Sequence, residues 1–167
     1  MMILALAVCF TAAGFGMAAA ADTIKIGFNA PLTGFAASDG KSSTEGTKLA
    51  VNQINEAGGV LGKKLELIIY DDQAKPAQSI PIANKLIGRD KVVLGISDSY
   101  SGATRSAAGV FQENKMPYIS AYAIHPDITR AGNYVFRTSF LGEVQGKAGA
   151  KLLGEMMGKK KVVVITL

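Results

Sequence analysis

The chain has 167 residues and a formal net charge of +5, from 18 Lys and Arg against 13 Asp and Glu. Its single cysteine, Cys9, and single histidine, His125, leave no pair for a disulfide and argue against a zinc cluster. The basic run 159–161 is typical of a solvated turn, and basic residues are not interleaved with aromatic ones as nucleic-acid binding requires. We therefore expect no metal, no other cofactor and no nucleic-acid partner.

Residues 1–21 carry no charged side chain and contain an apolar run, 3–10, followed by four alanines at 18–21. This order is typical of a secretory signal peptide that is cleaved near Ala21. A membrane anchor is the alternative, but glycines dilute the run and it is short for a bilayer. We expect residues 1–21 to be removed on export, so that the exported chain carries no thiol.

Apolar runs with strand character alternate with helical patterns through the rest of the sequence. Such alternation favours right-handed crossovers and one mostly parallel sheet. The predicted fold class is α/β, a three-layer sandwich with a mostly parallel sheet. In chain order we expect strand 23–29, helix 43–57, strand 64–70, helix 76–87, strand 92–97, helix 102–114, strand 118–122, strand 134–138, helix 144–157 and strand 161–167.

Glycine and proline mark the ends of several of these elements. Pro31 and Gly34 break the chain after the first strand, and the pair at 58–59 supplies a left-handed stop for the first helix. Pro76 suits the first turn of the second helix, whereas Pro81 is expected to kink that helix or delay its start.

Four loops leave the same edge of such a sheet, where open α/β folds bind small ligands. These loops are 31–40, 71–75, 97–101 and 121–127. The third is the most informative, because a buried strand passes into Ser97-Asp98-Ser99-Tyr100-Ser101-Gly102-Ala103-Thr104 and then opens a helix. Hydroxyl and backbone N–H groups converge there, and the positive end of the helix dipole favours an anion such as a carboxylate.

The hydroxyls of Ser99, Ser101 and Thr104 are therefore candidate ligand contacts. The alternative for such a serine is an ordinary helix N-cap, and both roles can hold together because they use the same N–H groups. Tyr100 and Tyr122 stand beside the turn, and each offers an apolar face and a polar tip that suit the lining of a cleft. For each tyrosine a place in the core is the alternative.

Few residues suggest catalysis. Asp71 and Asp72 end a strand and are expected to cap the next turn rather than to act as acid and base. His125 is a candidate base for Ser101 or Ser120, but the chain contains no Gly-x-Ser-x-Gly elbow. We expect a binding protein rather than an enzyme, with an exported serine hydrolase as the remaining alternative class.

Five segments carry a family resemblance: Pro31-Leu32-Thr33-Gly34, residues 45–62, Tyr70-Asp71-Asp72, Ser101-Gly102-Ala103-Thr104 and residues 133–138. In this order and spacing they resemble the N-terminal half of periplasmic branched-chain amino-acid-binding proteins, the Leu/Ile/Val-type solute receptors of ABC transporters. The resemblance implies the type I periplasmic binding fold, with two lobes that close on an amino acid or a related small carboxylate. It also implies a periplasmic location and an ABC permease partner in the inner membrane.

By that resemblance the chain divides into a signal peptide, 1–21, and an N-terminal ligand-binding lobe, 22–140. Residues 141–167 are expected to form the crossover and the first helix and strand of a truncated second lobe. The apolar run at the end of the sequence is typical of a central strand, which a loop and a helix normally follow. We therefore expect the sequence to be part of a longer protein.

The resemblance places Ser101 at the serine that grips a ligand carboxylate, with Thr104 one helical step behind it. Tyr122 matches a position that contributes mainly a backbone group. Ile124 stands where the family commonly has a threonine for the ammonium, and Asp39 where a tyrosine often covers the ligand. These two departures weigh against a plain leucine-type ligand. A ligand-sensing domain of a regulator or receptor uses the same lobes and is the close alternative to transport.

Overall fold

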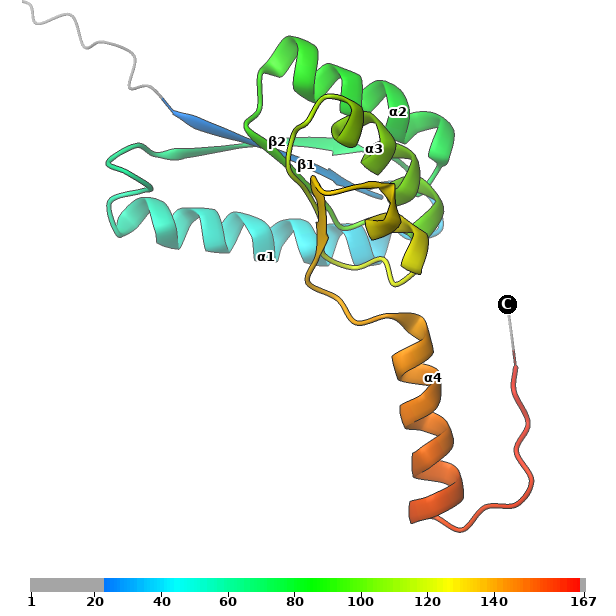
Figure 1. The fold of residues 1–167 in the computed structure, drawn as a ribbon. Coiled ribbons are helices and arrows are strands. Elements are labelled where there is room, and N and C mark those ends of the chain that lie inside the picture. The colour runs from blue at the N-terminus through cyan, green and yellow to red at the C-terminus, as the bar shows by residue number, and fades with distance from the viewer. Residues whose placement is uncertain (1–22, 166–167) are drawn as a thin grey trace, which may run out of the picture.

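A computed structural model describes residues 23–165 as a five-stranded parallel sheet with helices against both faces (Figure 1). The signal peptide predicted over 1–21 lies outside the described residues. π-helical turns follow α2 and α4, and a 3₁₀ helix precedes β5. In chain order the elements are β1 (Ile24–Ala30), α1 (Ala37–Glu56), β2 (Leu65–Asp71), α2 (Pro76–Lys85), β3 (Leu94–Ser97), α3 (Ser101–Glu113), β4 (Tyr118–Ser120), β5 (Val135–Arg137) and α4 (Gly142–Lys151).

The strand order across the sheet is β2-β1-β3-β4-β5, and every neighbouring pair is parallel. α1 lies on one face of the sheet, along β1 and β2, and α2 and α3 lie side by side on the other (Figure 1). The predicted α/β sandwich with a mostly parallel sheet is confirmed. All five strands point their carboxyl ends toward one edge, where the four predicted loops emerge.

The buried core lies between the sheet and the α2–α3 layer. Leu86, Phe111, Tyr118 and Ile128 are among its fully buried side chains. The rings of Phe111 and Tyr118 stack with their centroids 4.5 Å apart. They rest directly on β3 at Gly95, where an added Cβ would lie 2.5 Å from the Phe111 ring. The glycine in β3 therefore lets two aromatic rings pack against the sheet.

Helix α1 begins at Ala37, before the start predicted at Ser43. The sequence of this stretch, rich in small polar residues with a glycine at 40, is typical of a loop. In the structure Gly40 faces Pro31 so closely that a Cβ would lie 2.2 Å from the Pro31 carbonyl oxygen. The close contact with Pro31 thus requires a glycine at this position, and Gly40 does not mark a break in the helix.

Helix α2 begins at Pro76 and continues past Pro81, so the delay expected from that proline is not observed. A proline inside a helix removes one N–H donor, crowds the carbonyl four residues before it and disfavours the helical conformation of the preceding residue. Packing of α2 along α3 holds the helix through this position. Within the residues described, no helix is both long and apolar enough to cross a bilayer.

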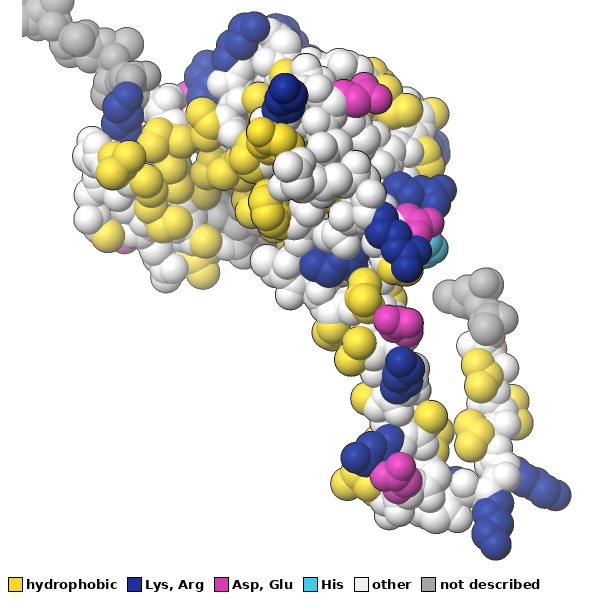
Figure 2. Space-filling view, viewed as in Figure 1, with side chains coloured by type: hydrophobic (Ala, Val, Ile, Leu, Met, Phe, Trp, Pro, Cys, Tyr) yellow, Lys and Arg dark blue, Asp and Glu magenta, His cyan; other side chains and the backbone are white. Residues whose placement is uncertain are grey.

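Helix α4 extends away from the rest of the molecule, and the segment after it runs back alongside (Figure 1). Its side chains are exposed from residue 143 to 151, with hydrophobic and charged groups both visible in Figure 2. The three lysines at 159–161 are exposed, as predicted for a solvated turn. The strand predicted over 161–167 is not formed in its described part, 161–165, because no described strand lies beside it to supply ladder hydrogen bonds.

Candidate functional site

The four loops at the carboxyl edge of the sheet are joined to one another by side-chain contacts. The backbone N–H of Leu32 donates to the Asp71 carboxylate over 2.9 Å, which links the loops after β1 and β2. The Tyr100 hydroxyl donates to Asp39 over 2.9 Å, and its ring lies 5.4 Å from that of Tyr122. The predicted convergence of these loops is confirmed.

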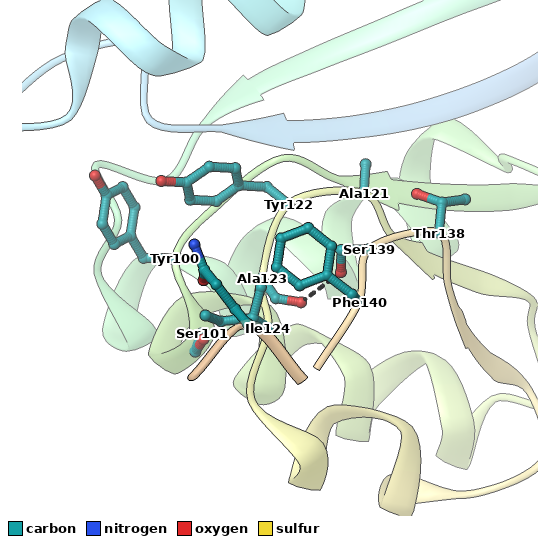
Figure 3. A pocket seen from close by; sticks show the side chains of 10 residues that line it. Tyr100, Ser101, Ala121, Tyr122, Ala123, Ile124, Thr138, Ser139 and Phe140 are labelled. Atoms are coloured by element: carbon teal, nitrogen blue, oxygen red, sulfur yellow. Dashed lines mark hydrogen bonds between the residues drawn. The ribbon is translucent and has the colours of Figure 1, made fainter. Parts of the chain in front are cut away.

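A cavity of about 650 Å³ opens at this edge (Figure 3). Its walls are the start of α3, residues 121–124 after β4, residues 138–140 after β5, and Gln145 from α4. Of the predicted site residues, Tyr100, Ser101, Tyr122 and Ile124 line the cavity. That any of them touches a ligand stays a prediction.

Three polar side chains in the cavity wall have no hydrogen-bond partner within residues 23–165. They are the hydroxyls of Ser101 and Thr138 and the amide of Gln145. Ser101 is also the first residue of α3, where backbone N–H groups have no carbonyl partner within the helix. The hydroxyl and these N–H groups form a neutral donor site with the positive end of a helix dipole behind it.

Thr104 does not line the cavity. It is fully buried, and its hydroxyl lies 2.8 Å from the Ser97 hydroxyl and donates to the Ser99 carbonyl over 3.0 Å. Sequence spacing places Thr104 one turn behind Ser101, but that turn faces the sheet rather than the open edge. Its hydroxyl therefore holds the Ser97–Ser99 turn in place.

A buried hydrogen-bonded network extends from this turn across the neighbouring strand ends. The Asp72 carboxyl accepts hydrogen bonds from the Ser99 hydroxyl over 2.9 Å and from the Asn29 amide over 2.6 Å. The Tyr118 hydroxyl donates to Asn29 over 2.8 Å, and burial raises the pKa of Tyr118 far above its ordinary value. Asn29 was not among the residues predicted from the sequence, where its only signal is a polar side chain inside an apolar strand.

Asp39 also lies outside the cavity wall. Its carboxylate accepts the hydroxyl proton of Tyr100, and this hydrogen bond, with a further contribution from the Tyr122 hydroxyl, raises the pKa of Tyr100 to about 12. The contact fastens the beginning of α1 to the turn before α3. Asp39 is therefore joined to the cavity wall only through its hydrogen bond with Tyr100, and a role for it in ligand binding stays a prediction.

Asp71 and Asp72 cap the turn after β2, as predicted. Asp71 accepts from the N–H groups of Leu32 and Gln73, each over 2.9 Å, and from the Thr33 hydroxyl. Burial by itself raises the pKa of Asp71, but the Thr33 hydroxyl and these backbone donors outweigh it and lower the pKa below the ordinary value of 3.8.

Asp71→Asn is expected to lower the free energy of unfolding by about 1 kcal/mol at pH 7, a value discounted for the partial exposure of the site. Because the folded-state pKa is depressed, the carboxylate stabilises the fold above its unfolded-state pKa. That contribution is lost as the pH falls through the folded-state value, below 3.8. Urea denaturation of the parent chain and the variant between pH 7 and pH 2 measures the difference in their free energies of unfolding. A difference that stays constant over this pH range would contradict the prediction.

The geometry gives no support to the hydrolase alternative. The Nδ1 atom of His125 accepts from the backbone N–H of Asp127 over 3.2 Å, and the buried Ser120 hydroxyl donates to the Ala123 carbonyl over 3.2 Å. Neither Ser101 nor Ser120 is hydrogen-bonded to His125 within the described part of the chain. Residues 23–165 contain no group of three or more His, Cys, Asp or Glu side chains that could hold a metal ion.

Phe140, Thr138 and Gln145 line the cavity and were not singled out by the sequence. They lie after β5 and on α4, in segments without a glycine-rich or Ser-rich turn. Only the fold brings them beside the start of α3, because β5 is the edge strand next to β4. No local pattern in the sequence could have located them.

Known proteins resemble the chain over most of its length. A 37% identical relative over 147 residues, 87% of this chain and 39% of that protein, is the Leucine-, isoleucine-, valine-, threonine-, and alanine-binding protein of Pseudomonas aeruginosa. A 38% identical relative over 91% of this chain and 41% of its own length is Leu/Ile/Val-binding protein homolog 3 of Brucella melitensis. The chain thus spans about two fifths of the length of the curated relatives that it matches.

Solved structures of solute-binding proteins also resemble the chain. The branched-chain amino acid transporter substrate-binding protein LivJ of Streptococcus pneumoniae, in complex with isoleucine, superposes with a TM-score of 0.78 at 32% identity over 82% of this chain and 39% of that one. An ABC transporter solute-binding protein of Rhodopseudomonas palustris, in complex with 3,4-dihydroxybenzoic acid, has a TM-score of 0.66 at 35% identity over 71% and 32% of the two chains. The sequence profile of the family described as "Periplasmic binding protein" matches residues 23–167, and the chain therefore belongs to that family of solute-binding proteins.

Proposed function

We propose that the chain is the ligand-binding lobe of an extracytoplasmic solute-binding component of an ABC importer. Its ligand is an amino acid or a related small carboxylate, bound in a cleft between two lobes and delivered to a permease in the inner membrane. Residues 1–21 would direct export to the periplasm. The observation that carries this proposal is the unpartnered Ser101 hydroxyl at the start of α3, exposed to a cavity at the carboxyl edge of the sheet.

The ligands of two similar proteins support a carboxylate anchor. Isoleucine and 3,4-dihydroxybenzoic acid, present in the two solved structures described above, share a carboxylate and differ in the rest of the molecule. In this chain the carboxylate would accept hydrogen bonds from the Ser101 hydroxyl and from the free N–H groups of the first turn of α3. The remaining part of the ligand would lie against Tyr122 and Ile124. Closure of a second lobe would exclude water and strengthen these polar contacts.

Ser101→Ala is expected to weaken carboxylate binding by about 1–3 kcal/mol, because it removes a direct hydrogen bond to a charged group. Millimolar affinity is expected of a single lobe, so the measurement is an NMR titration of the ¹⁵N-labelled chain with a panel of amino acids and small carboxylates. The amide signals at the start of α3 report binding at the proposed place.

Ser106→Ala is the matched control. Ser106 lies on the same helix, and its hydroxyl donates to the Gly102 carbonyl over 3.1 Å rather than to the cavity. Its replacement is expected to leave affinity unchanged. Equal affinities of the Ser101 and Ser106 variants, or titrations that leave the start of α3 undisturbed, would count against the proposed function.

A further inference from the structure

We propose that the outer edge of β2 binds an extended segment of a partner protein in which acidic and apolar side chains alternate. The segment would add a strand to the sheet beside Leu67 and Ile69. This inference goes beyond the proposed function, because it concerns the outer side of β2, whereas the cavity lies at the ends of β4 and β5.

β2 is an edge strand whose backbone groups alternate between β1 and the outside. The N–H of Ile24 donates to the Lys64 carbonyl over 2.9 Å, and the N–H of Asp72 donates to the Ala30 carbonyl over 3.1 Å. Even-numbered residues of this stretch therefore turn their N–H and C=O groups toward β1. The odd-numbered residues of β2 turn theirs outward, because successive residues of a strand face opposite ways.

The outward groups of Leu65 show that this edge accepts pairing. The Asn55 side chain, from the last turn of α1, accepts from the Leu65 N–H over 2.7 Å and donates to the Leu65 carbonyl over 2.9 Å. An amide that exchanges both bonds with one residue takes the place of a residue on a neighbouring strand. Within the described residues nothing does the same for Leu67 or Ile69, and unpaired edge groups of this kind are a template for an added strand.

The two faces of the sheet differ in chemistry beside this edge. On the α2 face, the Lys85 ammonium lies 4.2 Å and the Arg89 Cζ 5.9 Å from the ring centroid of Tyr70. On the α1 face, Leu67 and Ile69 present half-buried apolar side chains. Because side chains alternate along a strand, an added strand would place acidic groups near Lys85 and Arg89 and apolar groups against Leu67 and Ile69.

Carboxylates on and beside β2 are already engaged. Asp90 accepts from the Arg89 guanidinium over 2.7 Å and from the Tyr70 hydroxyl over 2.9 Å, and Glu66 accepts from the Thr23 hydroxyl over 2.7 Å. The Lys85 ammonium forms no ion pair within the part of the chain that the structure describes. It is therefore available to an acidic side chain of a bound segment.

A second copy of the chain is a less suitable occupant. Antiparallel pairing of two β2 strands about a two-fold axis brings the same surface of both copies together. Lys85 and Arg89 of the two copies would then lie along one face of the joined sheet, and like charges in an interface oppose association. An acidic segment meets the same cations with the opposite charge.

The experiment titrates the full ¹⁵N-labelled chain with a blocked peptide in which glutamate and valine alternate. We expect amide shifts centred on Leu67 and Ile69, and hydrogen exchange of these two N–H groups slowed about tenfold, with no change at the start of α3. A peptide of alternating lysine and valine is expected to bind about tenfold more weakly.

Equal affinities of the two peptides, or exchange at Leu67 and Ile69 that the acidic peptide does not slow, would overturn this inference and leave the proposed function intact. Slow exchange there before any peptide is added, in a chain that sediments as a dimer, would overturn it in favour of a second copy.

Ile69→Pro tests the backbone contacts. It removes one outward N–H and spares the bonds to β1, and proline is tolerated on edge strands. The variant is expected to weaken the acidic peptide about tenfold, while slow exchange of the Tyr70 N–H, which faces β1, reports an intact sheet. Unchanged affinity in a folded variant would overturn the inference.

Lys85→Gln tests the charge. It keeps most of the side-chain length and is expected to weaken the acidic peptide about threefold. Lys48→Gln is the matched control, because Lys48 lies on α1 and pairs with Glu45 over 2.8 Å. Equal losses in the two lysine variants would overturn the assignment of an acidic partner to this edge.

Discussion

Gly40→Ala is expected to destabilise the chain by about 3 kcal/mol, although alanine is intrinsically the better helix former. Gly40 lies near the beginning of α1, where an added Cβ would lie 2.2 Å from the Pro31 carbonyl oxygen and 2.6 Å from its carbonyl carbon. Because both are backbone atoms, α1 or the loop after β1 must move. Such a movement also pulls Asp39 away from the Tyr100 hydroxyl, so weaker ligand binding is expected to accompany the loss of stability.

Gly46→Ala on the same helix is the matched control. Nothing lies within 4 Å of a Cβ added at Gly46. This substitution is therefore expected to follow intrinsic propensity and stabilise the chain by about 0.5–1 kcal/mol. Urea denaturation of the two variants beside the parent chain gives both values. Changes of the same sign at the two glycines would show that Pro31 does not restrict α1.

Phe111→Ala is expected to lower the free energy of unfolding by about 3–5 kcal/mol, the cost of removing a buried phenylalanine and leaving a cavity. Phe111 is fully buried, stacks on Tyr118 and rests on the backbone of β3 at Gly95. The rigid strand beneath it cannot collapse into the space. Denaturant unfolding monitored by far-ultraviolet circular dichroism measures the loss.

Phe136→Ala provides the comparison for this core position. Phe136 lies on β5 and is 52% exposed. Its truncation removes about half as much apolar contact and leaves no enclosed cavity, so a cost of about 1 kcal/mol is expected. Similar losses for Phe111 and Phe136 would contradict the assignment of the core to the α2–α3 layer.

The parallel sheet was predictable because its strands are apolar runs separated by helical patterns. Residues 64–70 and 92–97 are of this kind; β2 forms one residue later than the first range, over 65–71, and β3 forms within the second. The early start of α1 was not predictable, because the contact of Gly40 with Pro31 depends on how the loop folds back. The described part of the strand expected over 161–167, residues 161–165, does not form for a related reason, since an apolar run forms a strand only where a neighbour pairs with it.

The site was predictable where local sequence carries the signal. Ser101 follows a buried strand and opens a helix, and the structure places it in the cavity wall. The sequence does not show which way a hydroxyl points, because that depends on which side of the helix is buried. Thr104 faces the sheet and is hydrogen-bonded to Ser97 and Ser99. Phe140 reaches the cavity only through the pairing of β5 with β4.

The buried network of Asn29, Asp72, Ser97 and Ser99 holds the turn before α3 in the proposed ligand-binding function. Most binding loops lose conformational entropy when they close on a guest, and that loss weakens affinity. Here the N–H and the hydroxyl of Ser99 each donate a hydrogen bond and its carbonyl accepts one, and these bonds order the turn during folding. In the proposed solute-binding function, a ligand would therefore meet a turn that is already ordered, and conformational change on binding would be confined to the lobe that closes over it.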